Sequence, residues 1–142
     1  MLLNLPTLLN LLNMLILGIE SSCDDTSVAL LDISEKGSVI LFEKTASQIE
    51  IHKKYGGVVP EIAGRMHAEK IVPLIDAALE GQPKPDAIAV TAGPGLITGL
   101  LVGVEAARTL SYAWDIPLIR TNHIEGHIYS TEISNAKFQM PN

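Results

Sequence analysis

The sequence is poor in the residues that mark several common classes of protein. It has one cysteine, Cys23, which excludes an internal disulfide and is typical of a reducing compartment; we expect its thiol to be a small buried side chain. Aromatic residues are only 4% of the chain. The apolar residues are therefore mainly Leu, Ile, Val and Ala, a composition that suits strands covered by helices.

Basic residues are also scarce. The formal net charge is −6, which argues against a nucleic-acid-binding module acting alone, because phosphate contacts need clustered Lys and Arg. The pair Lys53-Lys54 comes closest to a basic patch, and we interpret it as part of a solvated loop.

The first 13 residues show no targeting pattern. They are rich in Leu but lack the basic start and small-residue cleavage site of a signal peptide, and the arginines of a transit peptide. Pro6 and two asparagines would lie in hydrocarbon if this run crossed a membrane, so we expect no span and a cytoplasmic protein. We expect Met14 to be the functional start, residues 1–13 an extension, residues 14–136 one globular lobe, and residues 137–142 the start of a linker.

The first third of the chain alternates apolar runs with polar turns, which predicts an antiparallel meander. We expect its three strands at residues 15–20, 26–32 and 39–46. The polar segment 47–57 ends in a Gly-Gly pair, and we expect it to be a mobile loop.

The rest of the chain alternates helical periodicity with short apolar runs. Helices are predicted at 58–80, 97–113 and from 122 onward, and strands at 86–91 and 116–120. Pro73 has no amide donor and clashes with the preceding turn, so we expect two abutting helices or a kink there. Gly99 and Gly103 give the second helix a smooth face, which we expect to pack closely on the sheet or on a partner.

This order predicts an α/β lobe with a mixed five-stranded sheet, in which three antiparallel strands precede parallel strands and helices cover both faces. That is the unit of the ribonuclease H-like fold, which actin-like ATPases (the ASKHA fold) use in duplicate around a nucleotide cleft. Fold analogy alone says little about chemistry.

Two turns carry candidate functional residues. Asp24 and Asp25 lie between the first two strands, where carboxylates can position a metal-bound phosphate or orient a nucleophile, although Asp is also simply a good turn former. Gly93 and Gly95 flank Pro94 between a strand and a helix N-terminus, which has the physics of an anion-binding site but lacks the P-loop Lys-Ser/Thr.

Two histidines four residues apart form the most distinctive pattern. On a helix, His123 and His127 share one face and can reach a single metal ion, although such a pair can equally be two hydrogen-bonded surface histidines. The pattern is not the zincin motif, because Ile124 follows the first histidine where that motif has glutamate. We expect His52 and His67 to be solvated.

Five segments together resemble the TsaD family of tRNA threonylcarbamoyladenosine transferases, formerly called glycoproteases or O-sialoglycoprotein endopeptidases. In family order and spacing, they are 17–26 (LGIESSCDDT), 55–61 (YGGVVPE), 91–96 (TAGPGL), 101–103 (LVG) and 122–127 (NHIEGH). The resemblance covers about residues 15–129.

The resemblance implies transfer of threonylcarbamoyl from threonylcarbamoyl-AMP to N6 of adenosine 37, in tRNAs that read codons beginning with A. It implies that His123 and His127 hold one divalent metal ion, iron or zinc, with an aspartate of a second lobe. The acidic pair at Asp24 and Asp25 is implicated in activity, and the family usually has Glu at the second position. It also implies threonylcarbamoyl-AMP or an ATP-like nucleotide as the ligand of the complete protein.

The chain stops where family members continue into a second lobe, so we expect it to be the N-terminal lobe and inactive alone. The implied partners are tRNA, a TsaB-like paralogous subunit, a TsaE-like P-loop ATPase, and a homo- or heterodimer formed through helices of the lobe. The alternatives are a non-catalytic TsaB-like module, which lacks the histidine pair, and a metallopeptidase.

Overall fold

A computed structural model describes residues 13–34 and 37–135 of the chain. The elements it contains are β1 (Met14–Glu20), β2 (Asp25–Ser34), β3 (Gly37–Ser47), α2 (Ile49–His52), the 3-10 helix η1 (Lys53–Tyr55), α3 (Pro60–Leu79), β4 (Ala87–Gly93), α4 (Ile97–Trp114), β5 (Leu118–Asn122) and α5 (His123–Asn135). The expected linker at 137–142, and all but Asn13 of the expected extension, lie outside the described residues. No helix in the described part of the chain is both long and apolar enough to cross a membrane.

The five strands form one mixed sheet in the order β3-β2-β1-β4-β5. β1 pairs antiparallel with β2, and β2 antiparallel with β3, whereas β4 runs parallel to both β1 and β5. Helices α3 and α4 provide the crossovers that the parallel strands require. The predicted meander and mixed topology are therefore confirmed.

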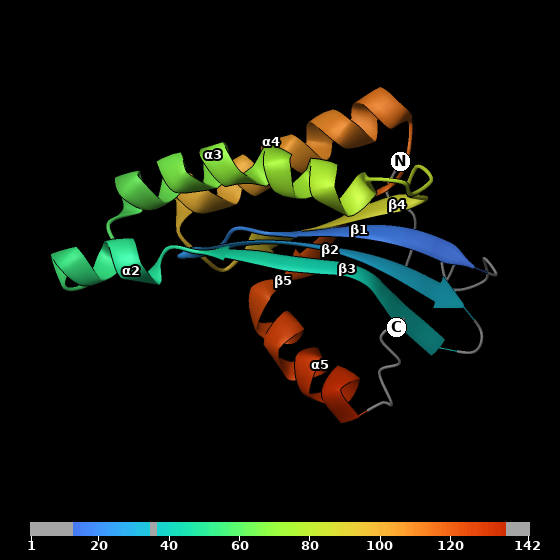
Figure 1. The fold of residues 1–142 in the computed structure, drawn as a ribbon, viewed down its shortest axis with the longest axis horizontal. Coiled ribbons are helices and arrows are strands. Elements are labelled where there is room, and N and C mark those ends of the chain that lie inside the picture. The colour runs from blue at the N-terminus through green and yellow to red at the C-terminus, as the bar shows by residue number, and fades with distance from the viewer. Residues whose placement is uncertain (1–12, 35–36, 136–142) are drawn as a thin grey trace.

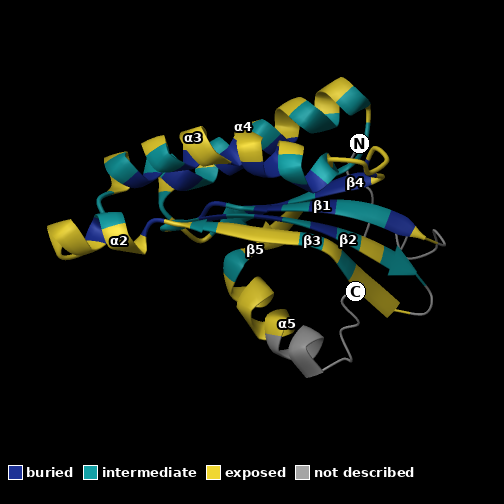
Figure 2. Cartoon of the chain, viewed as in Figure 1, coloured by how far each residue is buried: buried dark blue, intermediate teal, exposed yellow. Residues whose placement is uncertain are grey.

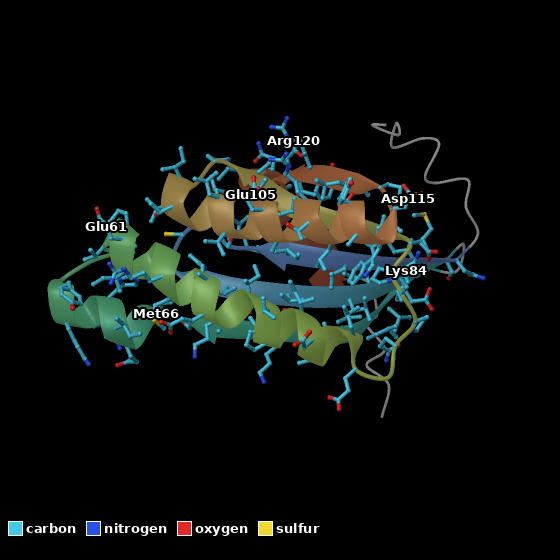
Figure 3. All side chains as sticks on the ribbon, turned by 90° about the horizontal axis from the view of Figure 1, so that it is seen from above. Glu61, Met66, Lys84, Glu105, Asp115 and Arg120 are labelled. Carbon is cyan, nitrogen blue, oxygen red and sulfur yellow. The ribbon has the colours of Figure 1, made fainter. Side chains whose placement is uncertain are left out.

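Helices cover both faces of the sheet. α3 and α4 lie side by side on one face and α5 on the other (Figures 1 and 3). Buried residues concentrate between the sheet and the α3–α4 layer, while the outer sides of these helices are exposed (Figure 2). The core there is built from Leu17, Ile19, Val28, Leu30, Ile71, Leu74, Ile75, Ala78, Ile88, Val90 and Ala107.

Helix α3 is one continuous element with Pro73 inside it, which excludes the first of the two expected alternatives, a pair of abutting helices. Pro60 opens the helix at its first position, where proline's missing amide costs nothing. His67 is fully buried, whereas Met66 beside it is only half-buried. The expectation that His67 is solvated was wrong, because the sheet is polar at this point and meets the imidazole with hydrogen-bonding groups.

The segment 47–57, expected to be a mobile loop, instead contains α2 and η1. Gln48 is buried, and its backbone N–H donates to the backbone carbonyl of Asp24 at 3.0 Å. His52 is also buried, and its ring nitrogens contact the Gln48 side chain at 3.0 Å and the Val59 amide at 3.3 Å. His52 is thus a structural residue and not the solvated one that we expected.

Helix α4 packs very closely on the turn after β1. A Cβ atom built on Gly99 would overlap the carbonyl oxygen of Ser21, and one built on Gly103 would overlap the Ser21 hydroxyl. That hydroxyl donates to the carbonyl of Gly99 at 3.0 Å. The face of α4 that carries Gly99 and Gly103 therefore packs toward the sheet, which is one of the two expected alternatives. At its C-terminal end Trp114 packs on the core, but Tyr112 is 91% exposed.

Candidate functional site

The site residues gather at one edge of the sheet. The parallel strands β1, β4 and β5 all finish there, with Glu20, Gly93 and Asn122 as their last residues. Since β2 is antiparallel to β1, it starts at the same edge with Asp25. The carboxyl ends of parallel strands are where α/β folds commonly bind ligands, so this edge is the natural place for a site.

The histidine helix starts directly from β5. Asn122 caps it, with its side-chain oxygen accepting hydrogen bonds from the amides of Ile124 at 2.8 Å and Glu125 at 3.4 Å. The first helical residue is His123, so both histidines lie within the first two turns of α5. The strand end and the cap thereby set where the imidazoles project.

The two imidazoles converge as their spacing predicts. The Nε2 atoms of His123 and His127 are 3.0 Å apart, and the rings meet edge to face at 86° with centroids separated by 4.5 Å. His123 is half-buried and His127 exposed. Two imidazole nitrogens at hydrogen-bond distance from each other can share a proton or, when both are deprotonated, a cation.

The other ring nitrogen of His123 is anchored to β1 and the following turn. Nδ1 lies 3.2 Å from Oε2 of Glu20 and 3.0 Å from the hydroxyl of Ser22. The second oxygen of Glu20 accepts the Ser22 backbone amide at 2.5 Å. The sequence analysis did not identify Glu20 as a site residue. The signal that could have indicated it is its position as the last residue of β1, at the carboxyl end of a strand that runs parallel to β4.

Glu20 is ionised at neutral pH despite its partial burial. Burial alone raises the pKa of its carboxyl group, but hydrogen bonds from the Ser22 and Thr91 side chains, the Ser22 amide and His123 outweigh it and hold that pKa below its ordinary value. The site therefore contains a fixed negative charge next to the imidazole pair.

The turn that contains Asp24 and Asp25 is hydrogen-bonded to helix α3 through His67. His67 Nδ1 is 2.8 Å from the Thr26 hydroxyl, and its Nε2 is 3.1 Å from the carbonyl of Cys23. Because Thr26 faces α3, strand alternation directs Asp25 to the face that carries α5. Within the described residues, Asp25 Oδ1 is a buried oxygen without a hydrogen-bond partner. No hydrogen bond or ion pair in that part of the chain joins Asp24 or Asp25 to the two histidines.

Cys23, which we expected to be buried, is exposed in this turn. Partial desolvation raises the pKa of its thiol, and the neighbouring carboxylates of Asp24, Asp25 and Glu20 add to this effect. A thiol with a raised pKa is mostly protonated at neutral pH and is a poor nucleophile. Cys23 thus does not have the electrostatic surroundings of a catalytic cysteine.

The glycine turn before α4 packs on the turn after β1. Gly93 has φ of 146°, a conformation reserved for glycine, and a Cβ on Gly95 would overlap Ser22. The amide of Leu96 donates to the Ser22 carbonyl at 2.7 Å. Gly95 must be small because the two turns are in direct contact there, whereas Gly93 is required by its backbone conformation.

A hollow of about 470 Å³ adjoins the histidines on the α5 face. Its lining includes Glu20, Thr91, His123 and His127. A larger hollow of about 1160 Å³ runs along the C-terminal half of α4 and the start of β5, away from these residues. We place the site at the smaller hollow, because the hydrogen-bonded charged groups converge there.

Comparison with known proteins identifies the family. Residues 39–141 match the family model described as TsaD: tRNA N6-adenosine threonylcarbamoyltransferase. The chain belongs to the TsaD family. It is 51% identical over 121 residues to the tRNA N6-adenosine threonylcarbamoyltransferase of Thermomicrobium roseum, an alignment that covers 82% of this chain but 32% of that relative. The chain thus spans about a third of the length of the TsaD relatives it matches.

Solved structures confirm the fold class. YeaZ from Pseudomonas aeruginosa superposes with a TM-score of 0.55 and 23% identity, covering 76% of this chain and 44% of YeaZ. T. thermophilus RuvC, solved with a Holliday junction substrate, superposes with a TM-score of 0.53 and 12% sequence identity. The match covers 78% of this chain and 67% of RuvC. These likenesses show a shared ribonuclease H-like fold, and the TsaD assignment rests on the sequence comparisons.

Proposed function

We propose that this chain is the N-terminal lobe of a tRNA-modifying acyltransferase. The complete enzyme moves the threonylcarbamoyl group from threonylcarbamoyl-AMP to N6 of adenosine 37, in tRNAs that read codons beginning with A. Membership of the TsaD family supports the reaction class. The observation that best supports a metal site is the 3.0 Å separation of the His123 and His127 Nε2 atoms.

The residues present fit a divalent metal ion, iron or zinc. Imidazole nitrogen is a preferred ligand of both metals, and the two Nε2 atoms face a common point at the rim of the hollow. When bound, such an ion polarises a carbonyl or holds a carboxylate of the donor, which assists acyl transfer to a weakly nucleophilic aryl amine.

The remaining site residues bind and orient. Glu20 and Ser22 hold the His123 ring through Nδ1, which leaves Nε2 directed at the hollow. Asp24 and Asp25 supply carboxylates at the same sheet edge, and the buried Oδ1 of Asp25 has no hydrogen-bond partner among the described residues. We assign the backbone at Gly93 and Gly95 to the phosphate end of a bound nucleotide, since the N-terminus of α4 attracts anions.

The described residues supply two ligands and one wall of the site. Among them no group of three or more His, Cys, Asp or Glu side chains could hold a metal ion. We propose that an aspartate from the second lobe of the complete enzyme provides the third protein ligand. The 142-residue chain alone is then expected to transfer no threonylcarbamoyl to tRNA, and transfer at a rate typical of the family would contradict the proposal.

The proposed protein partners are a TsaB-like paralogous subunit and a TsaE-like P-loop ATPase, acting with tRNA in the cytoplasm. Exposed apolar side chains on the outer sides of α3 and α4 support docking of the paralogue there; they are Val72, Ile97, Leu101 and Tyr112. The acidic lobe cannot supply a tRNA-binding surface by itself.

The alternatives are less well supported. A non-catalytic TsaB-like module has no use for the convergent histidine pair. A zincin-type peptidase needs a glutamate at the position of Ile124.

The test is metal binding by the purified chain. We expect Zn²⁺ or Fe²⁺ to bind in a ratio of about one, and His123→Ala and His127→Ala each to weaken binding at least about tenfold, because each removes one of two ligands. Glu125→Ala is the matched control, since it removes a carboxylate from the same turn of α5 but leaves the imidazoles. Unchanged metal content in both histidine variants would refute the ligand assignment.

A further inference from the structure

We propose that Glu20 is a positioning residue that fixes the tautomer of His123 and thereby keeps the Nε2 lone pair free for the metal ion. The inference deepens the proposed function, because it rests on metal binding by the histidine pair. It assigns a role to a carboxylate on β1 that lies 103 positions from the imidazole in sequence.

The argument begins with the contacts of one carboxylate. Oε1 of Glu20 accepts the Ser22 amide at 2.5 Å, and Oε2 lies 3.2 Å from His123 Nδ1. The two oxygens therefore accept from different donors, and the Ser22 and Thr91 side chains also hydrogen-bond to this carboxylate. The side chain of Glu20 is 30% exposed and that of His123 27%, so the pair is partly shielded from water.

The location of the imidazole proton follows from these contacts. An ionised carboxylate is only an acceptor, so a Nδ1 lone pair directed at Oε2 would be repelled. A proton on Nδ1 removes this repulsion and is shared between Oε2 and the hydroxyl oxygen of Ser22, which is 3.0 Å away. The neutral ring then carries its lone pair on Nε2, the atom that faces His127.

In the absence of metal, that lone pair accepts the Nε2–H of His127 at 3.0 Å. When an ion binds, only His127 has to move its proton to Nδ1, because His123 is already in the ligating tautomer. Hydrogen bonds of this type from carboxylates to ligating histidines raise metal affinity by about 10- to 100-fold in other proteins.

Ser22 cannot replace Glu20 in this role. A hydroxyl both donates and accepts, so it tolerates either tautomer of His123. Only the carboxylate, which lacks a hydrogen, discriminates between them.

The informative variant is Glu20→Gln, because it nearly preserves size and changes the donor pattern. Glutamine offers one acceptor oxygen where the carboxylate has two. When that oxygen accepts the Ser22 amide, the NH₂ group points at Nδ1 and donates to it, which moves the ring proton to Nε2 and blocks the ligand position. We expect Zn²⁺ affinity, measured by competition with a chromophoric chelator, to fall about 10- to 100-fold.

Glu43→Gln is the matched control. Glu43 lines the same hollow and is exposed, so its substitution removes the same charge from the same surroundings. We expect it to change Zn²⁺ affinity less than about threefold, which is the scale of a screened surface charge. An equal loss in the two variants would overturn the proposal in favour of a general charge effect.

A second measurement is independent of metal. The ¹⁵N shifts of the His123 imidazole, assigned by comparison with His123→Ala, should show the Nδ1–H tautomer in the wild-type chain and a shift toward Nε2–H in Glu20→Gln. The same tautomer in both proteins would overturn the inference. If the wild-type chain bound no Zn²⁺ the proposed function would fail, whereas tight binding that Glu20→Gln left unchanged would refute only the role of Glu20.

Discussion

His67 donates a hydrogen bond from its Nε2 atom to the backbone carbonyl of Cys23, across a distance of 3.1 Å and 44 positions in sequence. Since a carbonyl only accepts, Nε2 carries the proton and Nδ1 accepts from the Thr26 hydroxyl at 2.8 Å. This fully buried imidazole ties α3 to the turn that contains Asp24 and Asp25.

Replacing this imidazole should destabilise the fold. We expect His67→Ala to lower the free energy of unfolding by about 2–4 kcal/mol, because it removes two buried hydrogen bonds and leaves a cavity. Urea unfolding measures the change. Glu69→Ala, at an exposed position of the same helix, is the control and should change stability by less than about 0.5 kcal/mol. Similar small effects of the two substitutions would contradict the structural role of His67.

The same substitution should have opposite effects at two glycines. Gly103→Ala forces a methyl group into the Ser21 hydroxyl, so we expect a loss of about 1–3 kcal/mol. Gly126 on α5 has no atom within 4 Å of a built Cβ, so Gly126→Ala should gain about 0.5–1 kcal/mol through helix propensity. Thermal or urea unfolding of both variants checks the signs, and stabilisation by Gly103→Ala would show that α4 is less closely packed.

Cys23 should react slowly with alkylating agents although it is exposed. Its raised pKa leaves less thiolate at about pH 7.5 than an ordinary cysteine has, and the deficit should disappear only at pH values above that raised pKa. We expect iodoacetamide to modify the folded chain more slowly than the chain in urea. Asp24→Asn should speed the reaction, because it removes a neighbouring negative charge and a hydrogen bond that raise the pKa. Equal rates for the folded and unfolded chains would contradict this.

The outer surface of α4 offers a test of the proposed paralogue contact. Leu101 is 53% exposed, and a charge placed there would be buried without a partner if a TsaB-like subunit covered it. Leu101→Glu should therefore weaken association by at least about tenfold in calorimetric titration with the purified subunit. Val39→Glu, at an exposed position of β3, should not. If only the β3 variant weakened association, the docking surface would have to be placed elsewhere.

The sequence was informative wherever a local pattern determines structure. Apolar runs bounded by polar turns predicted β1 and β2, and the four-residue spacing of His123 and His127 predicted their convergence on one helix face. Contacts between distant segments could not be predicted in this way. A histidine such as His67 looks the same on a surface or in a core until the polar turn that it meets is known.

The same limit explains why Glu20 was missed. Its role depends on β1 and the start of α5 coming together, which requires the parallel placement of β4 and β5 between them. The segment 47–57 has few apolar residues, a composition that predicted a loop. Gln48 and His52 nevertheless give it buried hydrogen bonds, which no sequence periodicity predicts.

The position of the histidines at the start of α5 has an electrostatic consequence. Peptide dipoles make a helix N-terminus positive, so a cation held there alone is disfavoured by roughly 0.3–1 kcal/mol. Glu20 brings a negative charge to this helix end from β1, 3.2 Å from His123 Nδ1. It turns a helix end that repels cations into one that tolerates a cation, while the helix amides still favour an anion bound beside it.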